Sequence, residues 1–322
     1  MSALNVSLNK YSADFFGEFL KDDSINEICY NGGNIIWCED NKGEWHEYES
    51  ILNNDKALSF AQTAASFKKD KIDKTKPILS CILPNGERVQ IVIDPATKSD
   101  ITSITIRKPS KVRYKIQDYI KIGAIDENLA KIFSASVANG KNMVICGETG
   151  SGKTTFMKTL IDFIPLTDRI ITIEDVEEIK FYEHKNFVQL FYPSEAKTGD
   201  ALTSATLLKS CLRMKPDRIL LAEVRGAETY DFLNVIASGH NGSMTSCHAG
   251  SVKQCLDRLV MMAMQHDQAR ALGKDMIFQM VKDNIDVIIV FKKERGKRQV
   301  LEYLYHNEIY KRNKDDIFEA VA

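Results

Sequence analysis

The sequence has no long hydrophobic run and no closely paired cysteines. No run of about 18 apolar residues occurs in it, so we expect no transmembrane helix. The first residues, MSALNVSLNKYSADFF, lack the basic start and apolar core of a secretory signal, which predicts a cytoplasmic protein. None of the seven cysteines forms a CxxC pair, which argues against a zinc knuckle or a dithiol redox motif. We expect these cysteines to be small buried residues.

The sequence also has almost no net charge. The formal charge of −1 argues against a chain that coats nucleic acid, and no basic stripe rich in aromatic residues is present. We therefore expect no intrinsic sequence-specific binding to nucleic acid. Hydrophobic residues make up 44% of the chain, as in ordinary globular proteins, and its 322 residues suffice for two domains.

The amino-terminal part of the chain mixes helical and strand patterns. Apolar spacing predicts helices over residues 11–20 and 55–68, the second with Asp55 as its N-cap. Strand-like runs occupy residues 25–30, 34–40, 44–50 and 101–108, with a hairpin over 77–95 that turns at Pro84-Asn85-Gly86. Together these elements predict a smaller α+β N-terminal domain of antiparallel sheet and helices, residues 1–108.

A change of pattern follows the basic stretch IRKPSKVRY, within which residues 109–114 are expected to form a linker. From 115 to 322, unbroken apolar runs such as NMVICG, RIITIED, NFVQLFY and RILLAEV alternate with helical patterns. This alternation predicts an α/β domain whose parallel sheet is covered on both faces. The tail, DVIIVFKKERGKRQVLEYLY, predicts a hairpin that turns near Gly296.

The segment GETGSGKTT fits the phosphate-loop pattern G-x-x-x-x-G-K-[ST]. The apolar run MVIC precedes it and the helical pattern TTFMKTLIDFI follows it, so strand, loop and helix occur in the required order. Backbone N–H groups of such a loop, with the helix N-terminus, bind phosphate. We expect Lys153 to bridge the β- and γ-phosphates and Thr154 to ligate Mg²⁺. The candidate nucleotide-binding residues are Gly147, Glu148, Thr149, Gly150, Ser151, Gly152, Lys153, Thr154 and Thr155.

Acidic residues follow two of the expected strands. RILLAEVRG places Glu223 at the carboxyl end of a buried strand, where ligands bind in parallel sheets, and makes it a candidate general base for the attacking water. The run RIITIEDVEEI ends in a second cluster, in which either Glu174 or Asp175 could hold Mg²⁺ or water. Glu177 and Glu178 are expected in a solvated first helical turn, where acids suit the helix dipole.

Histidines and arginines supply the remaining candidates. His240 and His248 lie in SGHNGSMTSCHAG, a polar stretch expected to face the nucleotide, where either residue could sense the γ-phosphate or position a partner subunit. A metal site would need further ligands nearby, and none is evident. Arg88 and Arg107 lie on apparently adjacent strands of the first domain. Phosphoryl-transfer sites often need an arginine from another domain or subunit, so both are candidates.

In combination, these motifs resemble the traffic ATPases of type IV secretion, the eleventh VirB protein type, within the secretion and pilus ATPase superfamily. The resemblance extends nearly end to end. It rests on CGETGSGKTT, ITIEDVEEI, the block SCLRMKPDRILLAEVRGAETYDFLNVIASGHNGSMTSCHAGS, and NGERVQIV and ITIRKPS in the first domain. Within the family the sequence is most similar to the Helicobacter and Campylobacter group.

The resemblance implies an ATP-hydrolysing motor with a RecA-like P-loop C-terminal domain and Mg²⁺ as cofactor. It further implies a homohexameric ring, peripheral at the cytoplasmic face of the inner membrane, that powers substrate translocation, pilus assembly or both. The implied partners are other type IV secretion components, namely the coupling protein and an inner-membrane ATPase.

The resemblance also implies roles for individual residues. Lys153 and Thr154 would bind phosphate and Mg²⁺, Glu223 would be the catalytic acid of the Walker B region, and Glu174 the important residue of the acidic box. Family Walker B segments commonly have glycine where Ala222 stands, which should not alter the carboxylate. Arg88 and Arg107 fall where N-terminal-domain arginines approach the nucleotide. The expected catalytic residues are Glu223, Lys153, Glu174, Arg107 and Arg88.

Three alternatives remain open. Within the superfamily, the chain could be a pilus-retraction or a type II secretion ATPase, although the latter often carries a tetracysteine zinc module and no CxxC pair is present. A nucleic-acid-dependent motor is disfavoured by the near-neutral charge. A scaffold that binds nucleotide without hydrolysis is disfavoured by the intact Lys153, Thr154 and Glu223.

Overall fold

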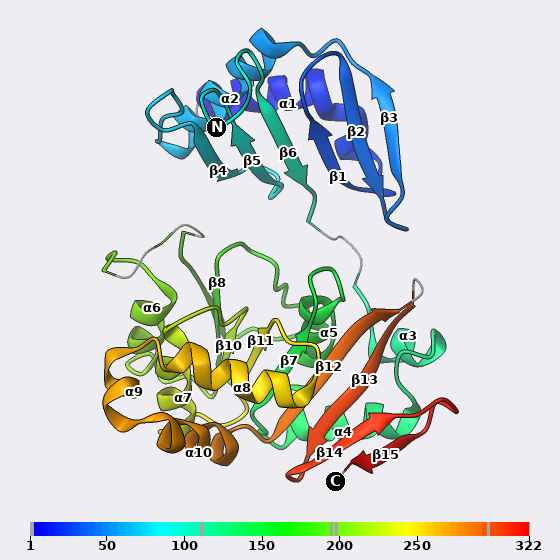
Figure 1. Ribbon diagram of the computed structural model, residues 1–322, viewed down its shortest axis with the longest axis vertical. Helices are drawn as coiled ribbons and strands as arrows, with labels where there is room; N and C mark the ends of the chain where they lie inside the picture. Colours follow the sequence, from blue (N-terminus) through cyan, green and yellow to red (C-terminus); the bar gives the residue numbers. More distant parts are fainter. Residues whose placement is uncertain (1–2, 110–112, 194–195, 197–198, 295–296, 322) are drawn as a thin grey trace. The chain divides into compact units, whose positions relative to one another are not determined.

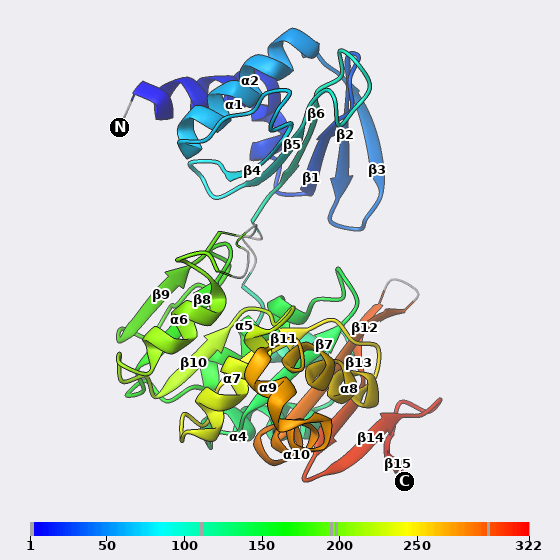
Figure 2. The same ribbon diagram turned by 60° about the vertical axis from the view of Figure 1, so that its left-hand side comes forward.

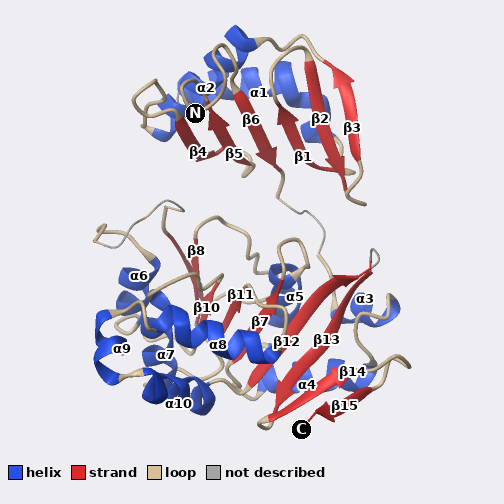
Figure 3. Ribbon diagram, viewed as in Figure 1, coloured by secondary structure: helices blue, strands red, loops and turns tan. Residues whose placement is uncertain are grey.

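The chain divides into two units, Met1–Val112 and Arg113–Ala322, each described here by itself (Figures 1 and 3). The structure is a computed structural model that describes residues 3–109, 113–193, 196, 199–294 and 297–321. The division between the units falls within the stretch predicted as a linker, 109–114, of which residues 110–112 lie outside the described residues. No helix among the described residues is both long enough and apolar enough to cross a bilayer.

The first unit contains one antiparallel sheet with two helices on one of its faces (Figure 2). Its six strands lie in the order β3-β2-β1-β6-β5-β4. The elements are α1 (Ala3–Lys21), β1 (Ile25–Tyr30), β2 (Ile35–Asp40), β3 (Trp45–Glu49), α2 (Asn54–Lys68), β4 (Ile78–Ile82), β5 (Arg88–Val92) and β6 (Ser103–Arg107). The predicted α+β class of this domain is confirmed.

Alternation along the strands determines which face of the sheet carries polar residues. On β6, Ile104 and Ile106 are fully buried in the core formed with α1 and α2, while Arg107 is exposed on the opposite face. The strand register pairs Arg88 with Arg107 across β5 and β6, and pairs Arg107 with Glu27 across β6 and β1. The two candidate arginines are therefore direct cross-strand neighbours, as the strand patterns predicted.

Two details of this unit differ from expectation. Helix α1 begins at Ala3, well before the predicted start at residue 11. The N-cap of α2 is Asn53 rather than Asp55, because Asn53 has extended backbone angles and its side chain accepts the N–H of Lys56 at 3.0 Å. Asp55 lies instead in the first turn, where its charge still suits the helix dipole.

The second unit contains a nine-stranded sheet in the order β15-β14-β13-β12-β7-β11-β10-β8-β9. The strands from β12 to β9 in that order pair in parallel, and β13 to β15 extend the sheet antiparallel. The strands are β7 (Met143–Gly147), β8 (Ile170–Glu174), β9 (Phe187–Phe191), β10 (Arg218–Leu221), β11 (Met244–Cys247), β12 (Val287–Glu294), β13 (Lys297–Tyr305), β14 (Glu308–Arg312) and β15 (Phe318–Val321).

Helices cover both faces of this sheet, as the unbroken apolar runs predicted (Figure 1). One face packs on α6 (Ser204–Cys211), α7 (Glu228–Ala237), α8 (Val252–Ala263), α9 (Asp267–Leu272) and α10 (Lys274–Asn284). The other packs on α3 (Ile116–Lys121), α4 (Glu127–Ala138) and α5 (Lys153–Leu160), which the short 3₁₀ turn η1 (Ile161–Phe163) follows. Successive residues of β7 illustrate the arrangement, since Val144 belongs to the first core and Ile145 to the second. The α/β class of this domain is confirmed.

The carboxyl-terminal part of the chain contains more strands than predicted. The predicted hairpin is present as β12 and β13, while the turn near Gly296 lies outside the described residues. Two further strands, β14 and β15, continue the sheet beyond it.

Candidate nucleotide-binding site

The phosphate-loop segment connects the end of β7 to the start of α5, in the predicted order of strand, loop and helix. Gly147 must be small, because a Cβ there would lie 2.1 Å from the carbonyl oxygen of Phe291 on the neighbouring strand β12. Gly152 is the N-cap of α5 with φ of 102°, a left-handed conformation that favours glycine. These constraints bring the loop back over the helix N-terminus, where phosphate groups bind in such folds.

Lys153 is the first residue of α5 and is largely buried. Its Nζ donates to the carbonyl oxygens of Gly147 and Glu148, each at 3.0 Å. Burial lowers the pKa of Lys153, while the nearby charge of Glu223 opposes that shift. Among the described residues, the buried Ser151 hydroxyl has no hydrogen-bond partner. A buried ammonium that donates to neutral carbonyls, beside an unpaired hydroxyl, fits a loop that binds an anion.

Glu223 lies two residues beyond β10, at the same edge of the sheet as the phosphate loop. Its Oε1 is 2.9 Å from His248 Nε2, and His248 Nδ1 is 3.4 Å from Lys153 Nζ. Because Nδ1 faces an ammonium and Nε2 faces a carboxylate, the ring fits best as neutral imidazole that donates from Nε2. Burial and then Lys153 lower the pKa of His248, and Glu223 raises it. Lysine, histidine and glutamate thus form one hydrogen-bonded chain.

Glu174 and Asp175 have different surroundings although they are adjacent. Glu174 is fully buried, and its Oε2 accepts the N–H groups of Glu178 and Ile179, each at 2.8 Å. Its Oε1 accepts the Thr172 hydroxyl at 2.7 Å, and burial raises the pKa of Glu174 against these hydrogen bonds. Asp175 instead reaches the ion-pair network around Glu223. The geometry favours Asp175 over Glu174 for contact with Mg²⁺ or water.

The expected helical turn at Glu177 and Glu178 is not present. The backbone N–H of Glu178 donates to Glu174, and Ile179 is fully buried in the core beneath α5. These contacts hold the segment after β8 as an irregular loop.

The structure separates the two histidines, which is a correction. His248 directly follows β11, whereas His240 precedes it, and β11 runs parallel to β7. The intervening strand spans about 13 Å at 3.3 Å per residue, so His240 lies at the edge of the sheet opposite the phosphate loop. There its Nδ1 lies 3.2 Å from both the Val235 carbonyl and the Ser238 hydroxyl. Within one chain, His240 therefore does not face the phosphate loop.

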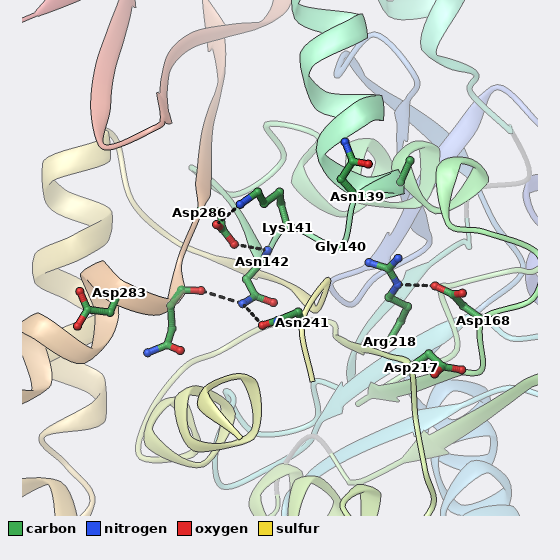
Figure 4. Close-up of a pocket in the computed structure, with 12 residues that line it drawn as sticks. Asn139, Gly140, Lys141, Asn142, Asp168, Asp217, Arg218, Asn241, Asp283 and Asp286 are labelled. Carbon is green, nitrogen blue, oxygen red and sulfur yellow. Dashed lines mark hydrogen bonds and ion pairs between the residues drawn. The ribbon is translucent and has the colours of Figure 1, made fainter. Parts of the chain in front are cut away.

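A polar cavity of about 500 Å³ lies at this opposite edge (Figure 4). In it, Arg218 Nε donates to Asp168 Oδ2 at 2.7 Å, and the guanidinium lies directly over Gly242, where a Cβ would be 1.6 Å from Nη1. Its lining contains none of the expected catalytic residues. The cavity is therefore separate from the nucleotide site.

Comparison with known proteins identifies the family. The profile described as "Type II/IV secretion system protein" matches residues 14–295. The VirB11 protein of the type IV secretion system of Brucella abortus is 43% identical over 297 residues, which cover 84% of this chain and 82% of the relative. The chain belongs to this family. It is a VirB11-type, nucleotide-hydrolysing secretion ATPase, as the sequence motifs indicated.

Other relatives agree with this assignment. PtlH of the type IV secretion system of Bordetella pertussis is 36% identical over 319 residues, covering 90% of this chain and 92% of its own. The crystal structure of the VirB11 ATPase of Brucella suis with sulphate is 38% identical, with a TM-score of 0.52 and coverage of 94% and 95%. The pilus retraction motor PilT with ADP shares the fold at 18% identity, with a TM-score of 0.65 and coverage of 98% and 84%. A grouping with Helicobacter and Campylobacter stays a prediction.

Arg225 is the residue of this secretion-ATPase site that the sequence analysis missed. It lies two residues after Glu223, and its side chain contacts both Glu223 and Asp175. The only sequence signal was its place within LLAEVRG. Arg88 and Arg107 belong to the other unit, and their approach to nucleotide stays a prediction.

Proposed function

We propose that the protein is the ATP-driven motor of a bacterial type IV secretion system. It acts as a homohexamer that powers substrate translocation, pilus assembly or both. It lies peripherally at the cytoplasmic face of the inner membrane, with the coupling protein and an inner-membrane ATPase as partners. The family membership supports this role, and the hydrogen-bonded chain from Lys153 through His248 to Glu223 is the observation that carries it.

The proposed chemistry begins at the phosphate loop. Lys153 exchanges the carbonyl oxygens of Gly147 and Glu148 for the β- and γ-phosphates of ATP, which offer full negative charge. The buried Ser151 hydroxyl gains a partner at the same time. Thr154, the second residue of α5, and Asp175 would hold Mg²⁺. When bound, this ion neutralises charge that develops on the phosphates.

Glu223 acts as the general base. With Oε1 it accepts the proton of the attacking water, at the edge of the sheet where the phosphates lie. His248 donates to the same carboxylate and lies next to Lys153, so it links the base to the phosphate-binding ammonium. When the γ-phosphate leaves, the negative charge near both Lys153 and Glu223 changes.

Motion of the amino-terminal unit converts hydrolysis into work. In this proposal Arg107 and Arg88, neighbours on one sheet face, close onto the nucleotide and release it after hydrolysis. Their pairing on adjacent strands supports joint action, since both guanidinium groups project from the same face.

Substitution of Lys153 tests the assignment. Lys153→Ala should abolish phosphate release from ATP, whereas Lys121→Ala, on an exposed lysine of α3, should leave it unchanged. Normal hydrolysis by Lys153→Ala would show that the site is misassigned. Light scattering after size exclusion tests the ring, and a monomer that hydrolyses ATP at the full rate would contradict the hexamer. No observation favours the pilus-retraction or nucleic-acid alternatives.

A further inference from the structure

Arg225 bridges two carboxylates that follow the carboxyl ends of β8 and β10. Its Nε and Nη2 donate to Glu223 Oε2 at 2.9 and 2.8 Å, and its Nη1 lies 3.3 Å from Asp175 Oδ2. A planar guanidinium can satisfy this arrangement because its N–H groups project in fixed directions. The two acids come from the ends of β8 and β10, so the bridge also joins two strand ends.

The bridge to Arg225 determines which hydrogen-bond acceptor positions of Glu223 remain available. A carboxylate offers about four acceptor positions. Arg225 takes two of them, both on Oε2, and His248 takes one on Oε1. Among the described residues these are the donors to Glu223, so one position is left, and it lies on the oxygen that faces His248 and, beyond it, Lys153. Arg225 therefore fixes the rotation of the carboxylate and leaves a single direction from which it can accept a proton.

The backbone of Arg225 is itself anchored. Its N–H and that of Gly226 donate to Glu228 Oε1 at 2.6 and 2.9 Å, in the first turn of α7. A Cβ at Gly226 would lie 3.1 Å from Gln265 Oε1, so the backbone here packs closely against that side chain. The side chain is about half exposed, with 52% of it accessible to solvent, although the backbone is held. A rigid anchor of this kind lets a supporting residue determine the direction of a catalytic one.

We infer that Arg225 is a positioning residue for hydrolysis: it orients the Glu223 carboxylate toward the attacking water and holds it in register with Asp175. This inference rests on the proposed function, in which Glu223 is the base. It makes a lysine a poor substitute, because one ammonium cannot reproduce the planar fork to Glu223 Oε2 and Asp175.

Steady-state kinetics of the full-length protein test this role. Arg225→Gln and Arg225→Lys should each lower kcat by about 10- to 100-fold, the range seen when residues that orient the ligands of a metal site are replaced. The KM for ATP should stay within about twofold, since an interaction used only in the transition state changes kcat alone. Arg270→Ala, on an exposed arginine of α9, is the matched control and should behave as wild type.

Chemical rescue separates positioning from a merely structural role. Because the side chain is half exposed, millimolar guanidinium should reach the space left in Arg225→Ala and restore part of kcat, while sodium chloride of equal ionic strength should not. All variants should bind a fluorescent ATP analogue and unfold at nearly the wild-type temperature. Absence of rescue in a folded, nucleotide-binding Arg225→Ala would overturn the positioning role.

Other outcomes are equally decisive. A wild-type or higher kcat in Arg225→Gln would show that the bridge does not assist hydrolysis, and a KM that rises as kcat falls would place Arg225 on the nucleotide itself. Either result overturns the inference while leaving the proposed function intact. Full activity of Glu223→Gln would instead overturn the proposed role of the base. In the double variant, Arg225→Gln should add little to the loss caused by Glu223→Gln, because it acts through that carboxylate.

Discussion

The opposite surroundings of Glu174 and Asp175 lead to a prediction that separates folding from catalysis. Replacing Glu174 with alanine removes the acceptor of two backbone N–H groups and of the Thr172 hydroxyl. The Ile179 N–H and the Thr172 hydroxyl are buried, and each costs about 1–3 kcal/mol when left unsatisfied. The free energy of unfolding of the carboxyl-terminal unit should therefore fall by roughly 2–6 kcal/mol.

The loss should be visible in thermal unfolding. For a unit of this size each kcal/mol lowers Tm by about 2–4 °C, so Glu174→Ala should melt on the order of 10 °C below wild type. Glu174→Gln should lose less, because its amide oxygen can still accept both backbone N–H groups. Asp175→Asn is the matched control, since it changes the adjacent side chain, which pairs with Arg225. It should keep Tm and lose kcat.

The assay combines melting by circular dichroism with ATP hydrolysis measured well below the transition. Turnover per folded, nucleotide-binding molecule should stay within a few-fold of wild type in Glu174→Gln. A variant with unchanged Tm and abolished turnover would refute the reasoning and return Glu174 to the catalytic role that the family resemblance implied.

Two further predictions concern conformation and pH. Gly242→Ala should destabilise the protein far more than Gly239→Ala in chemical unfolding. Both glycines have positive φ, but a Cβ at Gly242 would lie 1.6 Å from Arg218 Nη1, whereas no atom of the described residues lies within 4 Å of a Cβ at Gly239. Burial, and then the Lys153 charge, lower the pKa of His248 in the folded state, so the folded state binds the proton less tightly than the unfolded one. The contribution of His248 to stability should be present above pH 6.5 and lost as the pH falls through the lowered pKa. His248→Asn should remove that part of the pH dependence. An identical slope of the free energy of unfolding against pH in both proteins would contradict this prediction.

Local patterns explain which parts of the site could be predicted from sequence. The phosphate loop is contiguous, and its strand, glycines and helix lie within a few residues of one another, so Lys153 and Thr154 could be placed directly. Arg88 and Arg107 could be paired because alternation identifies both strands and their exposed face. The N-cap of α2 was assigned wrongly because Asn53 and Asp55 are both capping residues two positions apart, and only backbone angles distinguish them.

The histidines show where such patterns fail. The strand between them, MTSC, has four residues, two of them hydroxyl-bearing, and its sequence resembles a polar loop. It is fully buried because it lies between β7 and β10 in the middle of the sheet. Without that strand His240 and His248 appear equivalent, whereas its presence puts them at opposite edges.

Strand register explains why Asp175 rather than Glu174 shares Arg225 with Glu223, and no single segment of sequence contains that information. In the parallel pair β10 and β8, Leu221 is opposite Ile173, so both strands end at the same edge, and Glu223 and Asp175 each follow within two residues of that pair. Adjacent residues of an extended chain point to opposite sides, which turns Glu174 toward Thr172 and the loop after β8 instead. The bridge made by Arg225 depends on the same alignment, because a slip of one residue between β8 and β10 would exchange the two acids. Strand order and register therefore determine which side chains meet at this edge of the sheet. Asp175, Glu223 and Arg225 come together because β10 lies beside β8.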